Sequence, residues 1–126
     1  IREYLESKGY TVLDKGAYSE DSVDYPEFGH AVGNSIQSSE STKGIVVCGS
    51  GIGISMAANK VEGIRAALCT SAEHAKMSRL HNDANVLAIG ARMTDYKVII
   101  DIVDTWLSTE FEGGRHSRRV NKIEVS

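Results

Sequence analysis

The stretch GIVVCGSGIGISMAANK, residues 44–60, decides the fold class. Its first five residues are a short, continuous apolar run with β-branched side chains, which is typical of a strand covered on both faces. A glycine-rich turn follows, and residues 54–60 have the composition of a helix. A buried strand that passes through such a turn into a helix is the first half of a parallel βαβ unit.

The segments on both sides of this unit repeat the alternation of strands and helices. The predicted elements are a helix over 1–8, strand 10–13, a helix from Pro26 to Ile36, strand 44–48, helix 54–60, strand 65–69, helix 70–80, strand 86–90, helix 98–107 and a helix in the tail after Gly114. Thr70 and Glu73 are spaced as a capping box, and residues 14–25 are polar and turn-rich. The alternation predicts an open parallel sheet with helices on both faces, a Rossmann-like α/β fold, in a single domain that spans residues 1–126.

The sequence begins on a helix, although an open parallel sheet of this kind normally begins with a strand. A sheet without its N-terminal strand has either a gap or an exposed edge. We therefore expect a gap or an exposed edge in the sheet, and further residues before Ile1 in the natural protein.

Composition excludes several classes of protein. With 126 residues, 41% hydrophobic and 25% charged, the chain fits an ordinary globular protein rather than a disordered one. The net charge of −3 argues against a nucleic-acid-binding polycation, and no apolar run approaches the roughly 18 residues of a membrane span. Cys48 and Cys69 form neither a disulfide framework nor a CxxC metal pair, so a reducing, cytoplasmic location is expected.

The turn after residue 48 has the features of an anion site. Ligands of open α/β sheets bind at the carboxyl ends of strands, and glycines let backbone N–H groups approach them closely. A helix N-terminus adds positive potential, which favours the thiolate form of Cys48. Ile54 stands where a dinucleotide-binding GxGxxG motif needs glycine, and no P-loop is present, so the cradle is of another type. The alternative is a tight structural turn with a core cysteine.

Three further segments contain polar groups that suit chemistry or anion binding. His81 opens the sequence HNDAN before a predicted strand, where it suits an acid/base role; helix capping is the alternative. Arg92 follows the carboxyl end of that strand, so it can point across the same edge as Cys48, or it is simply solvated. Arg115 and Arg119 are four residues apart on one helix face, a spacing that suits a phosphate, although a solvated basic tail has the same sequence.

Together these segments resemble ribose-5-phosphate isomerase B and its relatives, the galactose-6-phosphate isomerase subunits. The resemblance is continuous from about Val23 to Val120. Its markers, in the family's order, are CGSGIGISMAANK (48–60), GIRAAL (63–68), HNDANVLAIGAR (81–92) and EGGRHSRRV (112–120).

The resemblance implies an aldose–ketose isomerase that interconverts ribose 5-phosphate and ribulose 5-phosphate through a cis-enediolate, without metal or cofactor. It makes Cys48 the base that removes the C2 proton. Some family members use a glutamate at the position of Ile54, so Cys48 is the base candidate of this loop. The other implied roles are enediolate stabilisation by Ser50 and the loop Gly49, Gly51, Ile52 and Gly53, ring opening by His81, substrate binding by Tyr25, Asn82 and Arg92, and phosphate binding by Arg115, His116 and Arg119.

The family also sets two expectations beyond the residues present. Its members begin with a strand and a Ser-Asp-His segment whose aspartate works with the ring-opening histidine and whose histidine contacts phosphate. This sequence does not contain that segment, so we expect poor or no activity from a polypeptide that begins at Ile1. Members are homodimers or homotetramers with shared active sites, so His81, Asn82 and the C-terminal arginines would serve the partner's Cys48.

Two other functions remain open from the sequence. One is isomerisation of a 6-phosphohexose, such as galactose 6-phosphate or allose 6-phosphate. The other is a non-catalytic module that binds a nucleotide or phosphate-sugar through the same turn and basic tail. The second function gives no reason for a cysteine at position 48.

Overall fold

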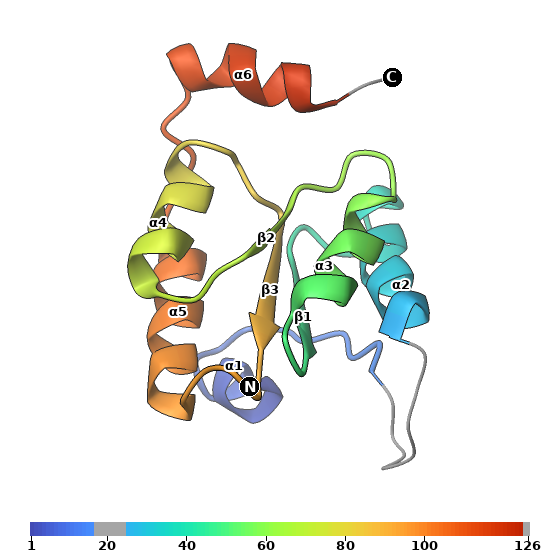
Figure 1. The fold of residues 1–126 in the computed structure, drawn as a ribbon, viewed down its shortest axis with the longest axis vertical. Helices are drawn as coiled ribbons and strands as arrows, with labels where there is room; N and C mark the ends of the chain where they lie inside the picture. The colour runs from blue at the N-terminus through green and yellow to red at the C-terminus, as the bar shows by residue number, and fades with distance from the viewer. Residues whose placement is uncertain (17–24, 125–126) are drawn as a thin grey trace.

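The computed structural model describes residues 1–16 and 25–124, so most of the turn-rich segment predicted over 14–25, and Val23 at the start of the resemblance, lie outside the described residues. Strands and helices alternate from α2 to α5, with one further helix before and one after this part of the chain (Figure 1). They are α1 (Arg2–Ser7), α2 (Tyr25–Gln37), β1 (Gly44–Cys48), α3 (Ile52–Asn59), β2 (Ala66–Leu68), α4 (Ala72–Leu80), β3 (Val86–Gly90), α5 (Tyr96–Ser108) and α6 (Arg115–Ile123).

The three strands form one parallel sheet in the order β1-β3-β2. In this register Cys48 lies opposite Gly90, and Leu68 lies opposite Ala88. All five residues of the central strand β3 are buried, as its continuous apolar sequence predicts. The predicted Rossmann-like α/β fold is therefore confirmed.

Helices cover both faces of the sheet (Figure 1). Helices α4 and α5 pack on one face, where Leu87 and Ile89 of β3 join a core around the fully buried Trp106. Helices α2 and α3 pack on the other face, where Val86 and Ala88 of the same strand contact a second core. Alternate residues of β3 thus serve opposite cores, which fixes its register, because a one-residue slip would exchange the two faces.

Helix α6 lies across the amino ends of the strands, at the top of Figure 1. Val120 anchors it with a buried side chain, and Glu124 just after it pairs with Arg65 at 2.7 Å. The buried Arg79 guanidinium supports the same end, because it pairs with Asp83 at 2.9 Å and donates to two backbone carbonyls. These polar groups are paired, as burial requires.

The strand predicted over 10–13 is wrong, because residues 10–15 form no strand. An open groove of about 1040 Å³ is lined both by residues 10–16 and by β1. A strand paired with the free side of β1 would lie about 4.8 Å from it, and the groove occupies this position instead. Among the described residues β1 pairs with β3 alone, so its other side is unpaired, as the expected gap or exposed edge requires.

The hydrogen bonds of β1 show which of its groups face this groove. Gly44 N–H donates to Asn85 O, and Cys48 O accepts from Ala91 N–H, so these two residues bond toward β3. Backbone groups of a parallel strand alternate in direction, so those of Ile45 and Val47 point to the groove. The Val47 side chain is 40% exposed.

Most helix ends lie within one or two residues of the predicted ones: α3 begins at Ile52 rather than at residue 54, and α5 begins at Tyr96 rather than at residue 98. Gly9 follows α1 with a φ of 90°, as expected for a glycine beyond a helix C-terminus. The predicted cap Thr70 is wrong by one residue: Ser71 has the extended backbone of an N-cap, and its hydroxyl accepts from His74 N–H at 3.1 Å. Within the described ranges, no helix has the length and apolar character needed to cross a membrane.

Candidate active site

Cys48 ends β1 at the carboxyl edge of the sheet, four residues before α3 begins at Ile52. Between them Gly51 has a φ of 78°, in the left-handed region. This conformation turns its N–H back, so that it donates to the Cys48 sulfur at 3.1 Å. A backbone donor on sulfur stabilises negative charge there, and the half-buried thiol also lines the groove beside β1.

The turn rests directly on the end of β3. A Cβ added to Gly51 would lie 2.9 Å from both Gly90 N and Ile89 C. A Cβ added to Gly90 would meet the Ser50 carbonyl oxygen. Glycine is therefore required at positions 51 and 90 by backbone contacts, and these contacts hold the turn in place.

The two other backbone N–H groups of the turn differ in whether they already have an acceptor. Ile52 N–H donates to the hydroxyl of the exposed Ser50 at 3.2 Å. Gly53 N–H lies in the first turn of α3, where backbone donors have no acceptor inside the helix. The Tyr25 ring covers Gly53, since a Cβ there would lie 2.5 Å from ring carbons. Tyr25 therefore forms a wall of the same site.

Arg92 joins this group, as predicted. Its backbone N–H donates to Gly49 O at 3.0 Å, and a Cβ added to Gly49 would lie 3.2 Å from its Cδ. Its exposed side chain lies at the edge that contains Cys48. We call this group the Cys48 half-site; its members are Tyr25, Cys48, Gly49, Ser50, Gly51, Ile52, Gly53 and Arg92.

A second group surrounds His81, which follows the last turn of α4. Its ring stacks on that of His116 from α6, with centroids 4.3 Å apart and planes 18° apart. The exposed Asn82, Arg115 and Arg119 lie on the same segments. We call this group the His81 half-site; its members are His81, Asn82, Arg115, His116 and Arg119.

The charge environment of His116 favours its neutral form. Burial lowers the pKa of His116, and the nearby His81 lowers it further. The Arg115 and Arg119 guanidinium groups act in the same direction, while the Glu112 carboxylate raises the pKa.

The two half-sites lie at opposite ends of β3. The connection 81–85 enters this strand at its amino end, whereas Arg92 follows its carboxyl end. Five residues at about 3.3 Å each place the two ends roughly 15 Å apart. One chain therefore does not bring all the predicted site residues together.

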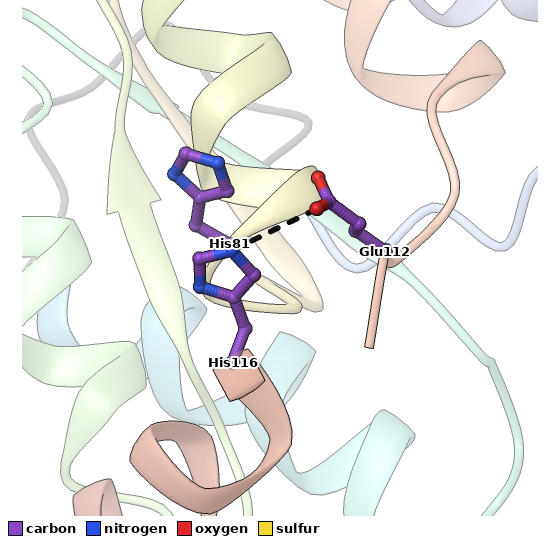
Figure 2. A group of neighbouring side chains, drawn as sticks. All are labelled: His81, Glu112 and His116. Atoms are coloured by element: carbon purple, nitrogen blue, oxygen red, sulfur yellow. Dashed lines mark ion pairs between the residues drawn. The ribbon is translucent and has the colours of Figure 1, made fainter. Parts of the chain in front are cut away.

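Sequence reasoning gave no role to Glu112, which contacts the His81 half-site. Its carboxylate lies 4.0 Å from His116 Nε2 (Figure 2). The available signal was its place four residues before His116, at the start of EGGRHSRRV. In the HNDAN segment, Asp83 and Asn85 are structural, since Asp83 pairs with Arg79 and Asn85 accepts from a backbone N–H.

The chain is thus an α/β protein of the Rossmann-like class, with a thiol in a glycine turn at the carboxyl end of β1 and a cationic helix at the opposite end of the sheet. Residues 1–123 match the ribose/galactose isomerase family. The chain belongs to this family.

Three known proteins show how close the likeness is. Ribose-5-phosphate isomerase B of Escherichia coli (strain K12) is 45% identical over 123 residues, which are 98% of this chain and 83% of that protein. The structure of ribose-5-phosphate isomerase B from Clostridium thermocellum has a TM-score of 0.96 at 55% identity, over 97% of this chain and 82% of that one. The structure of ribose-5-phosphate isomerase B from Mycoplasma genitalium with bound ribulose 5-phosphate has a TM-score of 0.92 at 42% identity, over 96% of this chain and 81% of that one.

Proposed function

We propose that this chain is an aldose–ketose isomerase that interconverts ribose 5-phosphate and ribulose 5-phosphate. The observation that carries the proposal is the Cys48 thiol, which is held at a strand end and accepts the Gly51 N–H at 3.1 Å. The E. coli and C. thermocellum relatives support the substrate, and so does the M. genitalium structure with its bound ketose phosphate. The two free cysteines suit a reducing, cytoplasmic location.

In the proposed reaction the Cys48 thiolate removes the C2 proton of the open-chain aldose. The electron pair of that C–H bond forms the C1–C2 double bond, and the C1 carbonyl oxygen becomes the enediolate oxygen. The Ser50 hydroxyl and the Gly53 N–H stabilise this oxygen. The proton then returns to C1 while the C2 hydroxyl proton moves to the C1 oxygen, which gives the ketose. Ile54 is buried in the core, so Cys48 acts without a carboxylate at that position.

The separation of the half-sites supports a shared active site. A base near Cys48 and a ring-opening histidine must reach the same sugar, and roughly 15 Å within one chain is too far. We propose a homodimer or homotetramer in which the His81 half-site of one copy faces the Cys48 half-site of another. Arg115, His116 and Arg119 would hold the phosphate; Tyr25, Asn82 and Arg92 would bind the sugar.

The base assignment is tested by Cys48→Ala in the full-length protein, assayed with ribose 5-phosphate and ribulose 5-phosphate. Loss of a positioned base should lower kcat by about 10²–10⁴-fold while sugar-phosphate binding is retained. Cys69→Ala is the matched control, because Cys69 is 1% exposed and far from solvent. Unchanged turnover in Cys48→Ala would remove Cys48 from the mechanism, and faster turnover of a 6-phosphohexose would overturn the substrate.

The shared site is tested by mixing two inactive variants, Cys48→Ala and His81→Asn, after reversible dissociation. In a mixed dimer one site contains both substitutions and the other contains neither. Random reassembly makes half of the dimers mixed, so about a quarter of the wild-type activity should return. If activity does not recover although mixed dimers form, then both groups act within one chain and the arrangement is wrong.

A further inference from the structure

A compact cluster of potential metal ligands combines two residues of the His81 half-site with the neighbouring Glu112 (Figure 2). His81, Glu112 and His116 each offer one nitrogen or oxygen atom, and these atoms lie within 4.8 Å of one another. They come from the end of α4, the α5–α6 connection and the first turn of α6. Three separate segments therefore converge on one point.

One of these atoms has an unexplained environment. His116 is 5% exposed, and its Nε2 is fully buried with no hydrogen-bond partner among the described residues. The facing Glu112 oxygen, at 4.0 Å, is too distant for a hydrogen bond. A buried nitrogen without a partner is costly, and such a group in a native protein requires a ligand or another explanation.

Backbone hydrogen bonds hold the three residues in register. Glu112 N–H donates to Leu80 O at 3.1 Å, which fixes the connection next to His81. His81 N–H donates to Met77 O at 2.9 Å, and His116 N–H donates to Gly113 O at 3.1 Å. Adjustment of the cluster therefore needs side-chain rotation alone, and the largest movement is available to Glu112, whose side chain is 57% exposed.

We propose that His81, Glu112 and His116 form a binding site for a divalent zinc ion. Two imidazoles and one carboxylate are a known zinc donor set that leaves a fourth position open. Zinc holds these ligands at about 2.0–2.2 Å, so ligand atoms must lie within about 4 Å of each other. The cluster meets this condition after contracting by about 1 Å. Imidazole donors select zinc over magnesium and calcium, which prefer oxygen.

The site goes beyond the proposed isomerisation, in which zinc takes no part. A zinc ion on His81 occupies a ring nitrogen that would otherwise move a proton during ring opening, so Zn²⁺ should inhibit the enzyme. The positive charges of Arg115 and Arg119 on the same helix oppose the cation, which limits the affinity. The site is thus a place where zinc and the substrate phosphate compete.

The test is calorimetric titration of the chelator-treated, full-length protein with ZnCl₂ alone. We expect one zinc ion per chain and no heat of binding from MgCl₂. Glu112→Gln, at an exposed position that does not threaten folding, should weaken zinc binding by about 10-fold or more, and His116→Ala by about 100-fold. The matched control is His74→Gln, an exposed histidine at the other end of α4, which should leave the affinity unchanged.

Equal zinc affinity in wild type, Glu112→Gln and His116→Ala would overturn the site, because the ion would then be bound elsewhere. This result is independent of catalysis, so it differs from a failure of the proposed isomerase. Turnover is measured in parallel with ribose 5-phosphate. The Zn²⁺ concentration that inhibits turnover should match the calorimetric affinity. In Glu112→Gln this concentration should rise as the affinity for zinc falls.

Discussion

Gly51→Ala should destabilise the protein far more than the same change at Gly63. Both glycines have a left-handed backbone, with φ of 78° and 83°. A Cβ at Gly63 meets nothing within 4 Å, whereas a Cβ at Gly51 lies 2.6 Å from Leu68 Cδ1 and 2.9 Å from the backbone of β3. Comparison of the two variants therefore separates the free-energy cost of a left-handed backbone from the cost of the clash between the added Cβ and its neighbours.

The magnitudes follow from these contacts. Alanine in a left-handed conformation costs about 1–2 kcal/mol, and this cost applies to both variants. Overpacking against atoms that cannot move adds about 1–3 kcal/mol at Gly51 alone. We expect a loss of about 1–2 kcal/mol for Gly63→Ala and of about 2–5 kcal/mol for Gly51→Ala, out of a total free energy of unfolding of about 5–15 kcal/mol.

The assay is equilibrium unfolding in urea, followed by circular dichroism. With a slope of about 2 kcal/mol per molar urea, the midpoint should fall by about 0.5–1 M for Gly63→Ala and by about 1–2.5 M for Gly51→Ala. The slopes should stay equal, so that the midpoints report stability. Equal midpoints for the two variants would refute the claim that the Cys48 turn rests on the end of β3.

Three further outcomes are expected. The hydrogen bond to Asp104 raises the pKa of Tyr4 from 10.0 to about 12, so its stabilisation is complete below pH 10 and is lost as the pH rises toward 12. Tyr4→Phe should lack this loss, which urea midpoints at pH 9 and near pH 12 would reveal. Arg79→Met should lower the free energy of unfolding by about 3–5 kcal/mol, because it leaves buried polar partners unpaired, and thermal unfolding measures this change. Iodoacetamide should modify Cys48 but not Cys69, whose pKa is raised by burial; peptide mapping that finds Cys69 equally labelled would contradict the burial.

The strands that pair within the sheet were predictable, and the segment that lacks a partner was not. The continuous apolar runs at 44–48 and 86–90 became β1 and β3 with the predicted bounds. The predicted burial on both faces holds for β3, whereas in the edge strand β1 Val46 is buried and Val47 is exposed. Residues 10–13 have a similar local composition but form no strand, because pairing depends on a neighbour that a local pattern does not contain. The cap of α4 fell on Ser71 rather than Thr70 for a related reason: two adjacent hydroxyls are equivalent in sequence, and the path of the chain selects one.

The sequence predicted which residues belong to the candidate site. It predicted only in part that they lie in two separate half-sites. The order of the chain already places His81 before a strand and Arg92 after it, so opposite ends of the sheet follow from parallel topology. The role of Glu112 was not predictable, because an exposed carboxylate is ordinary in any sequence. Only the fold brings it to 4.0 Å from the unpartnered nitrogen of His116.

The open edge of β1 has a consequence for amide hydrogen exchange with solvent. The amides of Gly44 and those bonded toward β3 are locked in the ladder and should exchange slowly, whereas those of Ile45 and Val47 face the groove and should exchange quickly. Fast and slow amides should thus alternate along this five-residue edge strand. A strand seated in the groove would slow Ile45 and Val47 and erase the alternation, so two amide rates report whether this edge of the sheet is covered.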